Sequence, residues 1–215
     1  MDIKCIIAIG NPGVEYYGTR HNVAQWIFLE LEKMQELGWQ KKSKLRAEIG
    51  FWSITTTKKK VMLVKPDVYM NESGISVRSI CDYFRLLPSD LMVIHDELDL
   101  PPGKLKLQIG GRASGHRGVL SIQKMLGNTQ FIRLRLGIGH PRSYSMNQSV
   151  SSFVLEKPSN TQEPMILEVV KCFCKNMDLL FEMEVMKANL VVMSINIQRQ
   201  ILSHSQCNCH HDQQK

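Results

Sequence analysis

Runs of consecutive hydrophobic residues alternate along the chain with stretches in which hydrophobic residues recur every three or four positions. The consecutive runs, such as residues 3–9, are typical of strands buried on both faces of a sheet. The recurring pattern predicts helices that bury one stripe, as in residues 23–37, where Asn22 or Thr19 is the expected N-cap. Strands that alternate with helices indicate a single α/β domain with a mostly parallel or mixed central sheet. The same reasoning predicts further strands at 49–55, 61–64, 91–94, 105–109 and 131–138, and further helices at 72–87, 119–126 and 163–185.

The end of the chain departs from this pattern. Residues 190–197 are hydrophobic, but the sequence from Gln198 onward is polar. We therefore expect an α/β domain over residues 1–186 and a partly disordered C-terminal extension over residues 187–215. The segment Cys207–His211 could bind a soft metal, but it lacks a second, distant pair of ligands, so a disordered tail is the favoured interpretation.

Composition and charge narrow the class of protein. Hydrophobic residues make up 43% and charged residues 22% of the chain, which is typical of a globular protein and excludes a collagen-like or fully disordered one. The net charge of +7 favours a polyanionic partner, and the basic stretch 41–46 is expected to be solvated. Six cysteines are too few for a disulfide scaffold, and neither a membrane-spanning run nor a signal peptide is apparent. We therefore expect a cytoplasmic protein that does not bind membranes.

Polar side chains gather at four places where a predicted strand ends. In an open α/β sheet, the loops at the carboxyl ends of the strands form the ligand site. A histidine, a carboxylate and several amides from separate loops could make a general-base site with donors for a carbonyl oxygen. Taken singly, His21 or Asn71 could cap a helix and Asp96 could anchor a turn. The four groups are Asn11, Tyr16, Thr19, Arg20, His21 and Asn22; Pro66, Tyr69, Met70 and Asn71; His95, Asp96 and Asp99; and the glycine-rich stretch 110–118 with His116.

Several well-known catalytic motifs are missing from the chain. A P-loop, the G-x-S-x-G motif of α/β-hydrolases, the H-E-x-x-H zinc motif and paired C-x-x-C sequences do not occur. The stretch Gly10–Gly13 is not a dinucleotide fingerprint, because its proline lacks an amide that a pyrophosphate would need. The residues by themselves therefore indicate an α/β protein, and a hydrolase is one function that they allow.

Five motifs, in this order and at these spacings, resemble the bacterial-type peptidyl-tRNA hydrolase family. The similarity extends from about residue 3 to about residue 185. The resemblance implies a single α/β domain with a twisted mixed central β-sheet flanked by helices. It also implies a monomer without metal or other cofactor that cleaves the ester between a peptide and the 3'-terminal ribose of tRNA. The motifs are Ile9–Gly13 with Tyr16 and Thr19–Asn22, Lys65–Asn71 with Ser73–Gly74, His95–Pro101, Gly115–His116, and Arg133–Gly139.

The resemblance also implies a role for each matching side chain. His21 would be the general base that activates water, and Asp96 would hold its imidazole in the productive tautomer. Asn71 would hydrogen-bond the peptide or the carbonyl oxygen as charge develops on it. The residues implied in substrate binding are Asn11, Tyr16, Met70 and His116, and those expected to bind tRNA phosphates are Arg135, Lys104, Lys106 and Arg117. For the strand residues among these cations, a solvated strand face is the alternative interpretation.

Three positions depart from the family pattern. Arg117 stands where the family usually has asparagine, which could disturb a peptide contact or add a phosphate contact. Gln108 stands where a lysine often binds the 5'-phosphate of tRNA, so Arg135 would be the remaining residue of that site. Ser114 replaces a more usual glycine, which we expect to be a minor change.

Three functions are therefore compared. The leading hypothesis is an active peptidyl-tRNA hydrolase, because His21, Asp96 and Asn71 are all present. The second is a non-catalytic relative that serves as an RNA-binding or RNA-processing scaffold. The third is an esterase of the same fold that acts on a small ester, which the excess of basic residues disfavours.

Overall fold

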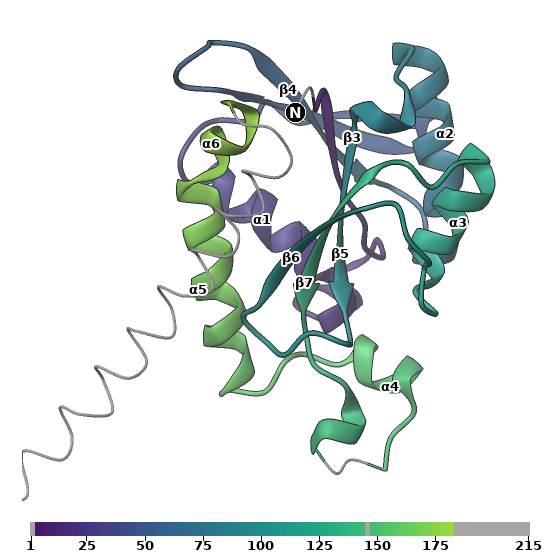
Figure 1. The fold of residues 1–215 in the computed structure, drawn as a ribbon, viewed down its shortest axis with the longest axis vertical. Helices are drawn as coiled ribbons and strands as arrows, with labels where there is room; N and C mark the ends of the chain where they lie inside the picture. The colour runs from purple at the N-terminus through teal and green to yellow at the C-terminus, as the bar shows by residue number, and fades with distance from the viewer. Residues whose placement is uncertain (1–2, 145–146, 183–215) are drawn as a thin grey trace, which may run out of the picture.

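A computed structural model of the chain, which describes residues 3–144 and 147–182, contains one mixed seven-stranded sheet (Figure 1). Its strand order is β2-β3-β4-β1-β5-β7-β6. β1 is central and runs parallel to β4 and β5, and β5 runs parallel to β7. β2, β3 and β6 add antiparallel pairings towards the two edges. The strands are β1 (Cys5–Ala8), β2 (Gln40–Lys42), β3 (Ala47–Ser53), β4 (Lys60–Pro66), β5 (Leu91–Glu97), β6 (Leu105–Ile109) and β7 (Ile132–Gly137).

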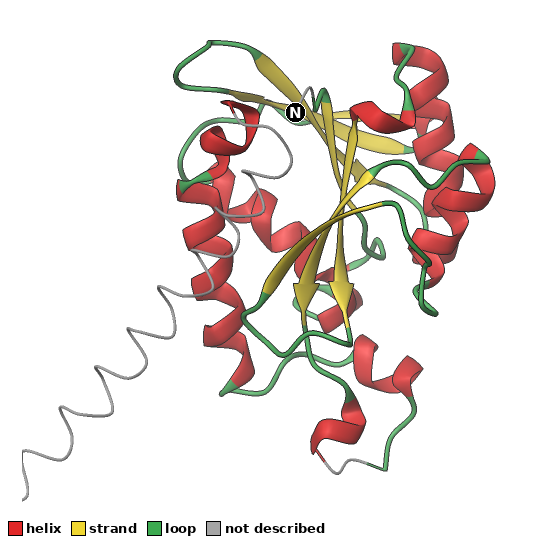
Figure 2. Ribbon diagram, viewed as in Figure 1, coloured by secondary structure: helices red, strands yellow, loops and turns green. Residues whose placement is uncertain are grey.

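Helices cover both faces of the sheet (Figure 2). α1, α5 and α6 pack on one face over a hydrophobic cluster that includes Phe28, Leu134 and Phe173. α2 and α3 pack on the other face over a second cluster that includes Ile80 and Phe131. The α-helices are α1 (Val23–Glu32), α2 (Ser73–Phe84), α3 (Arg117–Leu126), α4 (Val150–Leu155), α5 (Gln162–Lys175) and α6 (Met177–Glu182). No helix within the described residues has the length and hydropathy that a bilayer-spanning segment needs.

The mixed sheet flanked by helices confirms the predicted fold class, and every predicted strand and helix has a counterpart. The basic stretch 41–46 is exposed as expected except at Leu45, which is buried, and it contributes to β2 and a short 3-10 helix. One expectation was incomplete. The single helix expected over 163–185 breaks near Asn176 into α5 and α6. The predicted C-terminal extension, including residues 190–197 and Cys207–His211, lies outside the described residues.

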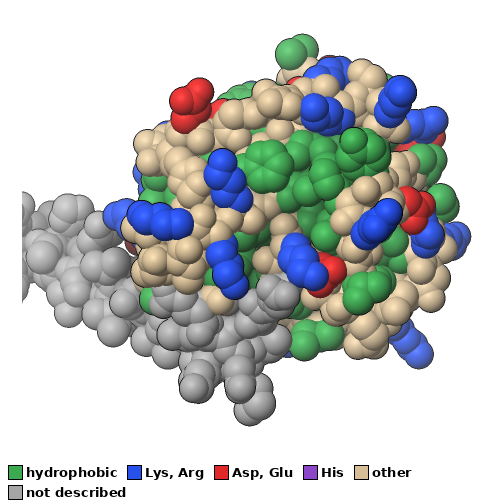
Figure 3. All heavy atoms as spheres, turned by 90° about the horizontal axis from the view of Figure 1, so that it is seen from above, with side chains coloured by type: hydrophobic (Ala, Val, Ile, Leu, Met, Phe, Trp, Pro, Cys, Tyr) green, Lys and Arg blue, Asp and Glu red, His purple; other side chains and the backbone are tan. Residues whose placement is uncertain are grey.

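Pairing of the central strands decides where the loops meet. Because β1, β4, β5 and β7 are parallel, their carboxyl ends lie at one end of the sheet, at the bottom of Figure 1, near α4. Figure 3 views the opposite end of the molecule, where Lys and Arg side chains surround a hydrophobic patch. Positive charge is therefore not confined to the end of the sheet where the loops converge, so net charge alone does not locate a surface for a polyanionic partner.

Candidate active site

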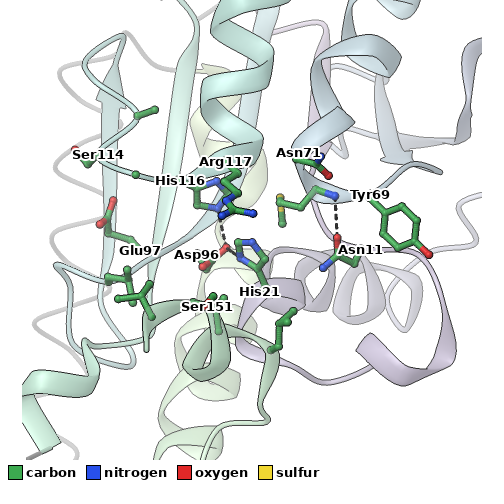
Figure 4. A pocket seen from close by; sticks show the side chains of 17 residues that line it. Asn11, His21, Tyr69, Asn71, Asp96, Glu97, Ser114, His116, Arg117 and Ser151 are labelled. Atoms are coloured by element: carbon green, nitrogen blue, oxygen red, sulfur yellow. Dashed lines mark hydrogen bonds and ion pairs between the residues drawn. The ribbon is translucent and has the colours of Figure 1, made fainter. Parts of the chain in front are cut away.

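A cavity of about 410 Å³ opens at the carboxyl ends of β1, β4 and β5 (Figure 4). Most of its polar lining comes from the four groups of residues that the sequence placed at strand ends, to which Glu97 and Ser151 are added. Met70, Leu98 and residues of α4 add a hydrophobic wall. Of the predicted site residues, the cavity brings together Asn11, His21, Met70, Asn71, Asp96, His116 and Arg117.

Asp96 lies between two histidines. Its Oδ1 is 2.9 Å from Nδ1 of His21 and 2.8 Å from Nε2 of His116. His21 belongs to the 3-10 helix Arg20–Asn22 that precedes α1, whereas His116 is the N-cap of α3. One carboxylate oxygen at the end of β5 thus joins two segments that are remote from it in sequence.

Hydrogen bonding fixes the tautomer of both rings. The backbone amide of Val119 can only donate, and it lies 3.3 Å from Nδ1 of His116. That nitrogen is therefore unprotonated, and the hydrogen of the neutral ring is on Nε2, which donates to Asp96. His21 donates to the same oxygen from Nδ1, so the lone pair of its neutral ring is on Nε2. His21 thus has the tautomer that a general base requires.

Electrostatics support the same assignment. Burial of the His21 imidazole favours its neutral form, but the charge of Asp96 and the hydrogen bond to it outweigh burial and raise the pKa of His21 above 6.5. Arg117 acts in the opposite direction and lowers this pKa. Burial favours a neutral Asp96, yet the charges and hydrogen bonds of His21 and His116 hold the pKa of the carboxyl below its usual range. Asp96 is therefore ionised throughout the physiological pH range.

Asn22, which lies behind the cavity lining, holds the lining residue Asn11 in place. Asn22 occupies the predicted N-cap position of α1, but its side chain makes no capping hydrogen bond. It bonds the backbone of Asn11 instead: its Oδ1 accepts from the Asn11 amide at 2.8 Å, and its Nδ2 donates to the Asn11 carbonyl oxygen at 2.9 Å. Oδ1 of Asn11 accepts from the amide of Met70 at 2.8 Å. This bond links the loop after β1 to the loop after β4 and leaves the Asn11 Nδ2 directed at the cavity (Figure 4).

Arg20, the neighbour of His21, holds α4 against the segment that carries His21. Its guanidinium lies 3.9 Å from the ring centroid of Phe153, and Nη1 donates to the carbonyl oxygen of Phe153 at 3.1 Å. Nη2 donates to Oε1 of Gln162 at 2.9 Å, which connects the same segment to α5. The sequence analysis assigned no role to α4, although Val150, Ser151, Val154 and Leu155 line the cavity. Hydrophobic residues at helical spacing after the N-cap Ser149, namely Val150, Phe153 and Val154, were the signal that could have identified this helix.

Other predicted residues lie outside the cavity lining. Tyr16 packs edge-on against Tyr69, a lining residue, with 6.3 Å between the ring centroids. Arg135 donates from Nε to Glu97 at 2.7 Å and from Nη1 to Oε1 of Gln108 at 2.8 Å, so its guanidinium is already engaged. Lys106 is an exposed residue of β6, and it pairs with Arg135 in the β6–β7 ladder. Lys104 immediately precedes this strand.

Donor atoms that could hold a metal are present in the described residues. His21, Asp96 and His116 each offer one ligand atom, and these atoms lie within 4.8 Å of one another. A metal at this site would bind to Nδ1 of His21 and Nε2 of His116, the same atoms that donate hydrogen bonds to Asp96.

Comparison with known proteins identifies the family of the chain. The sequence profile of the family described as "Peptidyl-tRNA hydrolase" matches residues 5–200. The chain belongs to the peptidyl-tRNA hydrolase family. It is 39% identical over 172 residues to the peptidyl-tRNA hydrolase of Bordetella parapertussis, covering 78% of this chain and 77% of the relative. The Neisseria meningitidis enzyme is 38% identical over 172 residues, which cover 78% of this chain and 85% of that protein.

Solved structures of peptidyl-tRNA hydrolases have the same fold. The crystal structure of peptidyl-tRNA hydrolase from Acinetobacter baumannii superposes with a TM-score of 0.81 at 31% identity, covering 89% of this chain and 94% of the other. The complex of a peptidyl-tRNA hydrolase with N-propanol gives the same values. The resemblance stated from the five sequence motifs is therefore confirmed.

Proposed function

We propose that His21, Asp96 and Asn71 carry the reaction of this peptidyl-tRNA hydrolase, the cleavage of the ester between a peptide and the 3'-terminal ribose of tRNA. The observation that supports these roles most directly is the contact of 2.9 Å between Nδ1 of His21 and the ionised Asp96. This contact leaves Nε2 of His21 as the basic nitrogen, in a cavity large enough to admit a substrate group.

In the first step, Nε2 of His21 removes a proton from a water molecule, whose oxygen attacks the ester carbonyl carbon. The carbonyl π electrons move onto the oxygen, and Asn71 donates a hydrogen bond to the oxyanion. Asp96 stabilises the imidazolium that forms and remains ionised throughout. A general base of this kind contributes roughly 10²–10⁴-fold to the rate.

In the second step, the tetrahedral intermediate collapses. The bond between the carbonyl carbon and the ribose oxygen breaks, and that oxygen takes the proton held on Nε2 of His21. The products are a peptide with a free carboxyl group and a tRNA with a free terminal hydroxyl, and His21 is again neutral. The reaction needs no external oxidant, reductant or cofactor.

Binding of the substrate would use the remaining predicted residues. Asn11 would hold a peptide amide or carbonyl, and Met70 would pack against the aminoacyl side chain. His116 would help to place the terminal ribose. Lys104, Lys106 and Arg135 would bind phosphates beyond the cavity, and Arg117 would meet the phosphates nearest to it. The tyrosine pair Tyr16 and Tyr69 would form the rim on the peptide side, with Tyr69 half exposed.

Single-turnover hydrolysis of an N-acetylated aminoacyl-tRNA by the wild type and by His21→Ala tests these roles. We expect the variant to lose the rate contribution of the base and to keep its fold, because the partly exposed His21 side chain belongs to neither hydrophobic cluster. Activity of His21→Ala near that of the wild type would remove the general-base role. A wild type that binds tRNA without cleaving it would favour the alternative, an RNA-binding or RNA-processing scaffold.

The cellular setting follows from the substrate. Peptidyl-tRNA is a product of translation, so we place the enzyme in the cytoplasm, where it would act as a monomer. Analytical ultracentrifugation of the full chain tests the monomer, since a concentration-dependent dimer would contradict it. Fractionation of the source cells tests the location.

A further inference from the structure

Arg133 is a fully buried arginine on β7, with 1% of its surface exposed. Its hydrogen bonds within the described part of the chain go to neutral acceptors. Nε and Nη2 donate to Nε2 of His95 at 3.0 and 2.9 Å. Nη1 donates to the carbonyl oxygens of Arg112 at 2.9 Å and Gly110 at 3.4 Å.

Stability does not explain this arrangement. Burying a guanidinium is costly, and a buried ionic group can often be replaced by hydrophobic residues without loss of stability. Burial lowers the pKa of Arg133, and the neighbouring charge of Arg135 acts in the same direction. The burial of the Arg133 cation therefore points to a role other than stabilising the fold.

The partners of Arg133 are the two segments that carry the catalytic groups. His95 directly precedes Asp96 on β5, and its Nδ1 lies 2.6 Å from the carbonyl oxygen of Asp96. The carbonyl oxygens of Gly110 and Arg112 belong to the loop that leads to His116. One rigid guanidinium therefore fixes the distance between the strand that ends in Asp96 and the loop that ends in His116.

Arg133 also determines the tautomer of His95. A guanidinium can only donate, so Nε2 of His95 is an acceptor and the hydrogen is on Nδ1, which donates to the Asp96 carbonyl. Burial, followed by the charges of His116 and Arg133, holds the pKa of His95 well below 6.5. The neutral His95 ring packs edge-on against His116, with 4.8 Å between centroids and an interplanar angle of 70°.

We infer that Arg133, acting through His95, is a positioning residue. It holds His116 and Asp96 at the separation at which Asp96 accepts hydrogen bonds from both His116 and His21. This inference rests on the proposed roles of His21 and Asp96. Arg133 and His95 touch none of the reacting atoms, and neither lines the cavity. The sequence places both within family motifs and His95 also among the polar residues at the strand ends, but the contact between them is recognisable only once the strands are packed.

The decisive variants are Arg133→Met and the double variant Arg133→Met/His95→Phe. The double variant replaces both polar partners with hydrophobic side chains of similar size, so it does not leave an unpaired imidazole in the core. The matched control is Ile132→Val, the neighbour of Arg133 on β7, whose side chain packs on the opposite face of the sheet. Single-turnover hydrolysis, tRNA affinity and the thermal unfolding midpoint are measured for each.

Histidine side-chain 15N–1H spectra of the full chain provide a readout that a merely structural role would not move. In the wild type we expect His116 as the neutral Nε2–H tautomer and His95 as the neutral Nδ1–H tautomer. In both Arg133 variants we expect His116 to lose its single tautomer. The single-turnover rate constant should fall about 10²-fold, as for a small misplacement of catalytic groups, with tRNA affinity unchanged. Ile132→Val should change neither the rate nor the spectrum.

Two results would overturn the inference. The first is a folded Arg133→Met or double variant with the wild-type rate constant. The second is a slow variant in which His116 keeps the wild-type tautomer, because the loss would then arise elsewhere. A wild type that does not cleave peptidyl-tRNA, or an active His21→Ala, would instead refute the proposed function and leave the spectra to decide the role of Arg133.

Discussion

Nδ1 of His21 lies 2.9 Å from Oδ1 of Asp96, although 75 residues separate the two in the chain. The side chain of Asp96 is 3% exposed, so this hydrogen bond forms in a medium of low dielectric constant, where it is strong. The contact gives His21 its basic Nε2 and raises its pKa. Both properties lead to measurable consequences.

The first prediction concerns pH. Because the base must be neutral, kcat/KM should rise with pH through the raised pKa of His21, at a midpoint above 6.5. In Asp96→Asn the carboxylate that raises this pKa is absent and burial dominates, so the midpoint should move to lower pH while the plateau falls by roughly 10²–10⁴-fold. The pH profile of single-turnover hydrolysis checks both effects. An unshifted midpoint in Asp96→Asn would contradict the electrostatic role of Asp96.

The raised pKa of His21 also affects stability, which depends on pH in the opposite direction to activity. The raised pKa of His21 means that the folded state binds a proton more tightly than the unfolded chain. This contribution is fully present below the unfolded value of about 6.5 and is lost as the pH rises through the folded pKa. Compared with the wild type, His21→Ala should therefore lose more unfolding free energy at pH values below this window than above it. Urea unfolding at several pH values provides the measurement.

A second prediction concerns Asn71, which lines the cavity from the short 3-10 helix before α2. Asn71→Ala removes the proposed donor to the oxyanion, and loss of one such donor typically costs roughly 10²–10³-fold in kcat. Asn160→Ala, at another exposed asparagine outside the cavity, is the matched control. Equal values of kcat/KM for the two variants would exclude Asn71 from the carbonyl site.

Arg117 leads to a third prediction. Its positive charge lowers the pKa of His21, so Arg117→Asn should shift the acid limb of the pH profile to higher pH. Arg112→Asn, an exposed arginine of the preceding loop that does not line the cavity, should leave the profile unchanged. If Arg117 acts only on tRNA phosphates, its loss would change KM and the salt dependence but not the position of the acid limb.

The fourth prediction separates phosphate contacts from general charge. Lys106→Ala should reduce the slope of log affinity for tRNA against log salt by about 1, as expected for one lost phosphate contact. Lys59→Ala, in the β3–β4 loop at the far end of the molecule, serves as the control. Equal slopes for the two variants and the wild type would make Lys106 a solvated strand residue, which is the alternative interpretation.

The fifth prediction concerns metals. Pretreatment with EDTA should leave the single-turnover rate constant unchanged, since the proposed steps use no metal. Added Zn²⁺ should inhibit, because a metal held by His21, Asp96 and His116 would replace the hydrogen bonds that the two histidines donate to Asp96. Inhibition that EDTA reverses would support this competition. Loss of activity on EDTA treatment alone would contradict the metal-free mechanism.

The sequence alone determined the fold class, the position of the buried strands and the set of polar residues at the strand ends. These features depend on side chains close together in the chain, where the period of the hydrophobic pattern is directly visible. The strand β6 was predicted with its observed limits, and β5 was predicted three residues too short. The missing residues, His95, Asp96 and Glu97, are polar, and their burial depends on partners from other segments.

Only the tertiary structure decided how these residues combine. It placed His21 and His116 on one oxygen of Asp96, paired Arg135 with Glu97, and joined Arg133 to His95. Each of these contacts depends on strand register and on the direction of a loop, neither of which follows from local propensity. The sequence therefore named the side chains for which we propose catalytic roles, whereas the packing of β5 against β7 and of α3 over the sheet fixed the tautomers of the histidines and the charge of Asp96.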